Sequence, residues 1–98
     1  MRYIELKKDG VVYRKESDIN RILIDQKFYW LIDSEVENST LEIKNNTLIW
    51  KGGEYLSGNW HYGIFKNGSF YGTWENGIWE NGNFNGKWIS GIRCDESI

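Results

Sequence analysis

The segment NGSFYGTWENGIWENGNFNGKW, residues 67–88, repeats one short unit with little variation. In each unit a glycine is followed two residues later by a large aromatic residue, and the next glycine comes two or three residues after that ring. The series begins further upstream, where Leu48 takes the glycine position before Trp50, and it ends after Gly91, which no aromatic residue follows. Such regular spacing predicts a repeat architecture. The aromatic residues of the series are Trp50, Tyr55, Trp60, Phe65, Phe70, Trp74, Trp79, Phe84 and Trp88.

The spacing within each unit indicates short extended segments with two different faces. Side chains two residues apart in a strand point to the same side, so the glycine and the ring share one face. Many glycines follow an Asn or a Ser, residue types that accept the backbone conformations of corners. A helix is excluded, because a glycine at every fourth or fifth position would cost about 1 kcal/mol each relative to alanine. The residues on the other face are mostly polar and comprise Glu54, Asn59, Ile64, Ser69, Thr73, Ile78, Asn83 and Lys87.

Two arrangements fit such strands, a MORN-like meander of hairpins and a β-solenoid. A meander would need strands of about three residues, which is short for an antiparallel ladder, whereas a coil with three-residue sides has no such limit. A longer period of fourteen residues is also present, and it favours a solenoid with like rings stacked inside it. The sequence leaves the number of sides and the handedness open. The expected columns of rings are Trp60, Trp74 and Trp88 in one and Tyr55, Phe70 and Phe84 in another.

The first half of the chain predicts strands joined by tight turns. Asp9–Gly10 and Asn45–Asn46 each separate two runs of alternating apolar residues, which is typical of a hairpin. The segment RILIDQKFYWLID, residues 21–33, has a similar pattern around residues 26–27 and predicts another pair of strands. A short helix over residues 17–23 is the alternative for the start of this region, because its isoleucines and leucine fall on one helical face.

These patterns predict an all-β protein with two parts and a tail. Burial of the rings only about offsets the conformational entropy lost when the array is ordered, so we expect the array to need a cap. The first half of the chain is the candidate for that cap. The predicted organisation is a hairpin-rich cap over residues 1–47, a Gly-x-aromatic array over residues 48–92 and a polar tail over residues 93–98.

The repeat unit resembles known repeat families. FYGTWENG (70–77) and FNGKWISG (84–91) resemble the opening of MORN repeats, which are β-hairpin arrays that commonly serve in protein interaction or membrane association. The five-residue step from a small to a large residue is similar to that of pentapeptide-repeat β-helices. Tandem Trp-Gly arrays of this style also resemble those of uncharacterised tailed-phage proteins. The resemblance covers residues 48–91 and implies an interaction or structural role.

Side chains that commonly carry catalysis are sparse. His61 is the single histidine and lacks a cysteine or a second histidine with metal-ligand spacing, so we interpret it as an exposed polar residue. Cys94, the one cysteine, excludes an internal disulfide and is interpreted as incidental. Glu75 and Glu80 recur at equivalent positions and are expected as surface charges on neighbouring corners. The sequence therefore predicts a protein that is not an enzyme and needs no cofactor and no metal.

Size, charge and composition limit the partners that we expect. A chain of 98 residues with a net charge of -2 is typical of a single small domain, and the repeat has too few Lys and Arg to favour nucleic-acid binding. No apolar run is long enough to cross a bilayer and the N-terminus lacks a signal-peptide core, so we expect no membrane contact and a cytoplasmic location, bacterial or host. Abundant Ile, Asn and Lys without Ala or Pro are typical of an AT-rich genome and favour a phage or a low-GC bacterium.

The aromatic rings are interpreted as an interior, because a stacked core explains their spacing and a binding face explains only their number. The functional hypothesis is a non-enzymatic protein-interaction or structural module, such as a small phage protein that binds a host or defence protein. A homodimer formed through the exposed repeat end at Trp88 is also predicted. The alternative is a small-molecule or carbohydrate binder that uses exposed rings. The candidate partner-binding residues are Tyr62, Trp88, Glu75 and Glu80.

Overall fold

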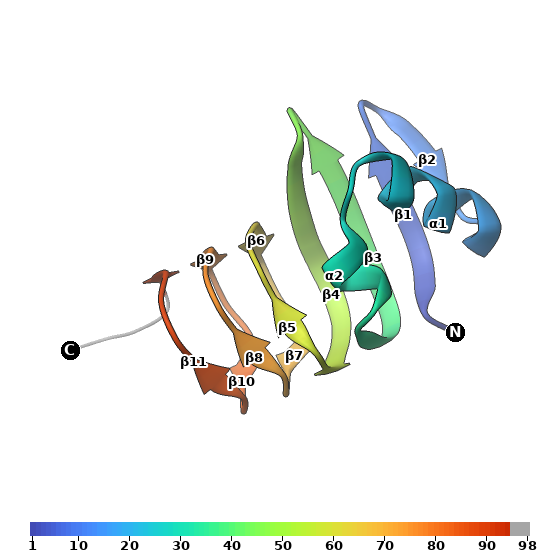
Figure 1. Ribbon diagram of the computed structural model, residues 1–98. Helices are drawn as coiled ribbons and strands as arrows, with labels where there is room; N and C mark the ends of the chain where they lie inside the picture. The colour runs from blue at the N-terminus through green and yellow to red at the C-terminus, as the bar shows by residue number, and fades with distance from the viewer. Residues whose placement is uncertain (95–98) are drawn as a thin grey trace.

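The computed structural model describes residues 1–94, and most of its regular structure is β-strand (Figure 1). Residues 95–98, the greater part of the predicted polar tail, lie outside the described residues. A sheet with two helices forms one end of the molecule, and a β-solenoid of about three turns forms the other. The predicted fold class, a mainly β protein whose repeat array forms a β-solenoid, is therefore confirmed.

Two predicted hairpins are present in the N-terminal part. The first pairs β1 (Tyr3–Lys8) with β2 (Val11–Tyr13), and the second pairs β3 (Glu35–Lys44) with β4 (Thr47–Ser57). The two residues of the first turn have φ of 50° and 84°, and those of the second have φ of 51° and 60°. Two-residue turns with positive φ match the twist of the strands that they join, which is why Asp-Gly and Asn-Asn suit these positions.

The hairpin predicted around residues 26–27 is wrong, because this region forms two helices, α1 (Glu16–Asp25) and α2 (Tyr29–Ile32). Residues 26–27 nevertheless form the tight turn that the pattern indicated. Lys27 has a φ of 63°, and its N–H and that of Phe28 bond to carbonyls in the last turn of α1 at 3.0 and 2.9 Å. A residue in the left-handed conformation with this pair of hydrogen bonds ends a helix. The turn therefore separates two helices instead of two strands.

The alternative prediction of a helix over residues 17–23 is confirmed by α1. Ile19 and Leu23 lie four residues apart and are completely buried, so one helical face enters the core. Glu16 and Asp18 place negative charge in the first turn, where the helix dipole favours it. Strand β2 and the two helices lie in the chain between β1 and β3, which run parallel to each other, and the helices lie together on one side of that sheet (Figure 1).

Strand β4 joins the two parts of the fold. One of its edges pairs antiparallel with β3, and the other edge pairs parallel with the first strands of the solenoid. The strand turns a corner at Gly53, where φ is 104°, so its first half forms one side of the coil and its second half forms the next. β3 follows the same corner with a bulge at Asn38, whose φ is 53°. The hairpin β3–β4 thus converts an antiparallel sheet into a parallel coil.

The remaining strands are two residues long and pair in parallel with the strand three places further along the chain. Three strands per turn give a three-sided coil, the number that the sequence left open. Parallel pairing also differs from the hairpin arrays that the MORN resemblance implied. The strands are β5 (Asn59–Trp60), β6 (Ile64–Phe65), β7 (Ser69–Phe70), β8 (Thr73–Trp74), β9 (Ile78–Trp79), β10 (Asn83–Phe84), β11 (Lys87–Trp88) and β12 (Ile92–Arg93).

The aromatic rings fill the coil in three columns, one for each side. Within a column the ring centroids lie 4.3 to 5.5 Å apart and the planes are within 13° of parallel. Rings of different columns meet edge to face, for example Trp60 and Phe65 at 76°. Both predicted columns are confirmed, and the third contains Trp50, Phe65 and Trp79.

The glycines of successive coils stack directly above one another. The carbonyls of the five glycines from Gly58 to Gly77 each accept a hydrogen bond from the residue after the next glycine in the column, as from Ile78 N–H to Gly63 O at 2.9 Å. A Cβ atom added to Gly77 would lie 2.5 Å from this same carbonyl oxygen, and Gly77 has a φ of 123°. The close approach of the backbones and the positive φ both exclude a larger residue.

Replacement of Gly77 by alanine should therefore lower the free energy of unfolding by at least about 2 kcal/mol, since it adds a backbone clash to a strained φ. Gly52→Ala is the matched control, because a Cβ atom there has no neighbour within 4 Å. We expect that variant to stay within about 1 kcal/mol of the wild type. Chemical denaturation measures both values, and equal stabilities for the two variants would contradict the steric role of the glycine column.

Candidate functional site

The sequence-predicted partner residues Tyr62 and Trp88 lie in different coils. Tyr62 follows β5 in the first coil, where its ring is 5.8 Å from those of Phe28 and Trp30 beside α2. Trp88 lies in the last coil and stacks on Trp74 at 5.3 Å. Tyr62 is 45% exposed, whereas Trp88 is only partly exposed. The structure therefore does not bring these two rings together.

The two predicted carboxylates lie on neighbouring sides of the coil. Glu75 follows β8 and Glu80 follows β9, and the N–H of each donates to a ring-bearing residue one coil below at 2.8 Å. The Oε2 atom of Glu75 is 3.6 Å from Nε2 of His61, and both side chains are partly exposed. Glu80 is exposed. The titratable group that Glu75 contacts is thus the histidine of the coil below.

The two ends of the solenoid differ. At the N-terminal end, α2 covers the first coil, and the ring of Trp30 lies 5.0 Å from that of Trp60. In the last coil, β10, β11 and β12 are terminal strands of their ladders within the described chain. The column rings of this coil, Phe84 and Trp88, are only partly buried, whereas every column ring of the earlier coils is fully buried.

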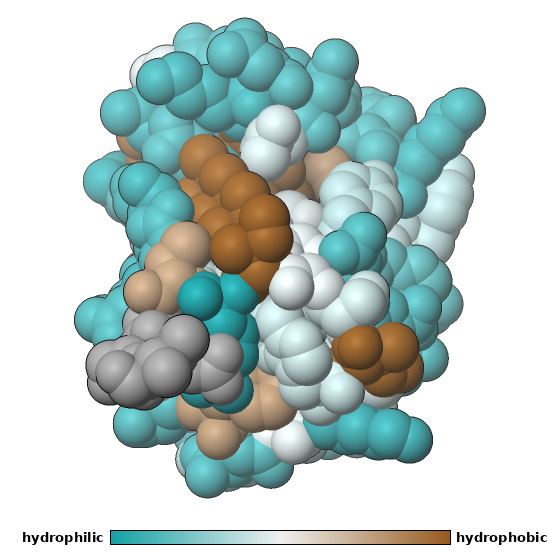
Figure 2. All heavy atoms as spheres, turned by 90° about the vertical axis from the view of Figure 1, so that its left-hand side faces the viewer, coloured by the Kyte–Doolittle hydropathy of each residue, from teal (hydrophilic) through white to brown (hydrophobic). Residues whose placement is uncertain are grey.

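Arg93 occupies the position at which the third column would hold its next ring. Its guanidinium carbon lies 5.1 Å from the ring centroid of Phe84 and 5.6 Å from that of Trp88, so the charge covers both rings through cation–π contacts. Ile89 and Ile92 flank this end and are 57% and 61% exposed. Figure 2 views this end and shows apolar atoms in the middle of the face with hydrophilic atoms around much of its rim.

An apolar ladder on the outside of one side of the coil reaches the same end. Four isoleucines occupy the outward position of successive strands on this side and pair with one another in register. The outward positions of the other two sides are polar, for example Asn59 and Thr73. In the sequence, an isoleucine stands before every third position of the ring series, and this pattern indicates the ladder. The pattern was missed because the outward positions as a whole are mostly polar. The ladder consists of Ile49, Ile64, Ile78 and Ile92.

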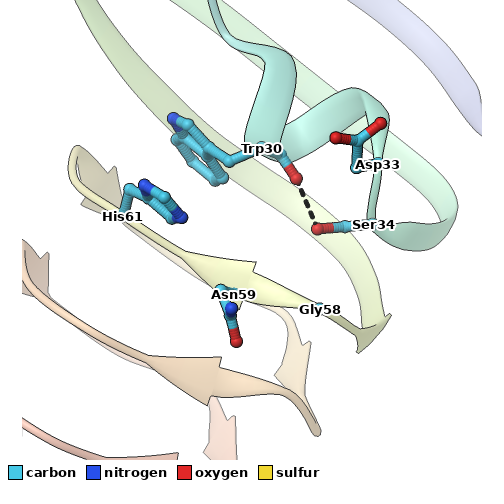
Figure 3. Close-up of a pocket in the computed structure, with 6 residues that line it drawn as sticks. All are labelled: Trp30, Asp33, Ser34, Gly58, Asn59 and His61. Atoms are coloured by element: carbon cyan, nitrogen blue, oxygen red, sulfur yellow. Dashed lines mark hydrogen bonds between the residues drawn. The ribbon is translucent and has the colours of Figure 1, made fainter.

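A groove lies between α2 and the first coil (Figure 3). Its volume is about 350 Å³, which lies at the small end of the usual size range of ligand sites. The ring of Trp30 stacks on that of His61 with an angle of 4° and a centroid distance of 5.7 Å. Sequence reasoning missed this groove because two of its residues, Trp30 and Asp33, come from the segment that was predicted as a hairpin. The lining residues are Trp30, Asp33, Ser34, Gly58, Asn59 and His61.

The wall of this groove is fixed by buried hydrogen bonds behind it. The Ser34 hydroxyl donates to the Trp30 carbonyl at 2.6 Å and lies 2.5 Å from the Tyr55 hydroxyl. The guanidinium of Arg2 donates to the carbonyls of Ser34 and of two residues of α2 at 2.8 to 3.2 Å. A Cβ atom on Gly58 would collide with the Ser34 hydroxyl, so glycine allows the coil to approach the helix. The C-terminal end of α2 is therefore held firmly against the coil.

Burial raises the pKa of Tyr55 from 10.0 to about 12. The hydrogen bond with Ser34 opposes this shift, the negative charge of Glu75 adds to it, and the positive charge of Arg2 lowers the pKa. Loss of the phenolic proton would leave a charge inside the core and is disfavoured. Tyr55 is thus a structural hydroxyl that stays neutral at physiological pH.

Comparison with known proteins adds no relative. No protein-family model matches the chain, and no curated protein or solved structure matches it either.

Among residues 1–94, no group of three or more His, Cys, Asp or Glu side chains is placed to hold a metal ion. None of the described helices has the length and apolar character that a membrane span requires.

Because the folded state raises the pKa of Tyr55, its neutral form contributes stability below pH 10 that is lost as the pH rises towards 12. Over this window the free energy of unfolding should fall by about 1.4 kcal/mol per pH unit from this group. Tyr55→Phe should remove that part of the slope, whereas Tyr71→Phe, at an exposed tyrosine, should keep it. Denaturation series between pH 9 and 12 test this, and parallel slopes for wild type and Tyr55→Phe would refute it.

Proposed function

We propose that this protein is a non-enzymatic binding module whose C-terminal solenoid end contacts a protein partner. The observation that carries the proposal is the difference between the two ends. α2 covers the first coil, whereas the last described coil has terminal strands and two incompletely buried rings. Terminal strands and exposed apolar groups are the features through which a sheet accepts further chain.

The chemistry of this end supports a partner that supplies both apolar and acidic groups. Ile89 and Ile92 offer apolar surface, and Trp88 offers a partly exposed ring. The guanidinium of Arg93 lies over the rings and would be displaced by, or paired with, a carboxylate of the partner. Aromatic and arginine side chains are common anchors at the centre of protein interfaces.

A second copy of the chain is one form that this partner can take. The predicted end-to-end homodimer would pair the terminal strands of two last coils and bury Trp88 in both. The same arrangement would bring two Arg93 guanidinium groups towards each other, and like charges at an interface are unfavourable. This repulsion favours a different protein as the main partner and a weak homodimer.

The source hypothesis extends the proposal to a class of partner. The composition is typical of an AT-rich genome, and a phage origin would make a host or defence protein in the cytoplasm the natural target. The groove beside α2 supports a second function, the binding of a small ligand, because it combines a stacked aromatic pair with polar side chains.

An affinity-capture experiment with three forms of the tagged protein tests the interaction. Wild type and Lys87→Glu, which changes an exposed outward residue of the same coil, should retain the same protein from a host lysate. Trp88→Glu should reduce its recovery at least tenfold, because it places a charge where the partner would bury the ring, a loss of more than about 1.4 kcal/mol. Circular dichroism confirms that each variant is folded. Equal recovery by all three forms, or no specific protein with the wild type, would contradict the proposal.

Sedimentation velocity of the wild type and Trp88→Glu tests the homodimer separately. We expect concentration-dependent association of the wild type that is lost in the variant. A wild type that sediments as a monomer at high concentration would exclude the homodimer and leave only a different protein as the partner.

A further inference from the structure

The groove between α2 and β5 lies at the opposite end of the coil from Trp88, so it offers a site that is independent of the proposed protein interface. Helix α2 and the residue after it provide Trp30 and Asp33, and the first coil provides Asn59 and His61 (Figure 3). Two elements that are distant in sequence thus each contribute one ring and one polar side chain. Convergence of a few polar groups beside an apolar wall is typical of a ligand site.

The apolar wall is the stacked pair of Trp30 and His61. Trp30 is also fixed from behind, because its ring meets that of Trp60 at 67° and that of Phe28 at 89°. The Ser34 hydroxyl also donates a hydrogen bond to the backbone carbonyl of Trp30 at 2.6 Å. A wall that is rigid before binding loses little conformational entropy when a ligand packs against it.

The polar side chains at the border are available for a ligand. Asp33 and Asn59 are both exposed, and neither side chain forms a hydrogen bond or an ion pair with another residue of the described chain. A carboxylate only accepts hydrogen bonds, whereas an amide both donates and accepts. Together they match a ligand with adjacent hydroxyl groups, each of which donates one hydrogen bond and accepts others.

The charges around the groove exclude other ligand classes. No Lys or Arg lines it, and the carboxylates of Asp33 and Glu75 lie on it or beside it, so a phosphate or another anion is disfavoured. A quaternary ammonium would suit the ring and the carboxylate, but its ammonium group has neither a hydrogen-bond donor nor an acceptor for the Asn59 amide. A neutral ring that carries hydroxyl groups satisfies both the donors and the acceptors.

We propose that this groove binds one ring of a neutral carbohydrate. The apolar C–H groups of the sugar contact the part of the Trp30–His61 pair that lines the groove, and its adjacent hydroxyls bond to Asp33 and Asn59. The volume of about 350 Å³ has room for a single sugar ring and part of the next, so a terminal residue of a glycan fits it better than an internal segment of a long chain.

The proposal can be tested by two-dimensional ¹H–¹⁵N NMR of the full chain, titrated with glucose, galactose, mannose, fucose and N-acetylglucosamine. Choline and AMP serve as the cationic and anionic comparators. We expect saturable shifts of the Trp30 indole N–H and of the Gly58 and Asn59 amides with at least one sugar, with a Kd on the order of 1 mM, and none with AMP. Shifts with choline alone would overturn the proposal in favour of a cation site, and silence with all five sugars would also overturn it.

Matched variants locate the binding. Asp33→Asn and Asn59→Ala change exposed side chains, so the fold should persist, and each should weaken sugar binding about tenfold through the loss of a hydrogen bond to a hydroxyl. Asp25→Asn removes an exposed carboxylate from α1, and Lys87→Ala changes the outward residue two coils further along the same side as Asn59. Both controls should bind as the wild type does. Equal binding by all four variants would place the sugar elsewhere and refute the site.

Discussion

Stacking of like rings one coil apart is the contact on which the rest of this structure depends. Parallel strands lie about 4.8 Å apart, and flat rings pack face to face at nearly the same distance, so a column of rings and a ladder of hydrogen bonds can share one repeat. The centroid distances of 4.3 to 5.5 Å within the columns show this match. Everything else in the coil accommodates the rings. Glycine at the corners allows the backbones to approach, and the short sides follow from an interior that three rings fill.

Packing of the rings leaves some buried N–H groups without a hydrogen bond. In the described chain, the buried indole nitrogens of Trp50, Trp60 and Trp74 have no hydrogen-bond partner, although such groups normally find one. These three nitrogens would lie 3.0 to 3.1 Å from a Cβ atom added to Gly68, Gly77 or Gly91, so each indole edge uses the space that a glycine leaves open. Each unpaired N–H costs on the order of 1 kcal/mol or more, which the apolar area of the indole offsets.

The sequence predicted the columns and two of the turns, because the columns depend on spacing and the turns on residue type. A fourteen-residue period fixes which rings stack, and Asp9–Gly10 and Asn45–Asn46 favour a tight turn wherever they occur. The number of sides in each turn of the coil depends on where the chain bends. Because every unit contains a glycine, the glycines do not specify this number. The segment around Lys27 was predicted wrongly because a left-handed residue ends a helix as readily as it joins two strands. The groove could not be predicted, since it requires α2 to lie against a coil about thirty residues further along the chain.

The in-register pairing of successive coils has a consequence for how this molecule can change length. An insertion or deletion of one complete turn would keep every ring column, glycine column and hydrogen bond in register, whereas a change of a single side would shift every later strand to the neighbouring side of the coil. Duplication of a short stretch of the gene would therefore yield a foldable product directly. Each such event would move the C-terminal end about 4.8 Å away from the helices while leaving both surfaces unaltered. The fold can thus act as a spacer whose length varies in fixed steps.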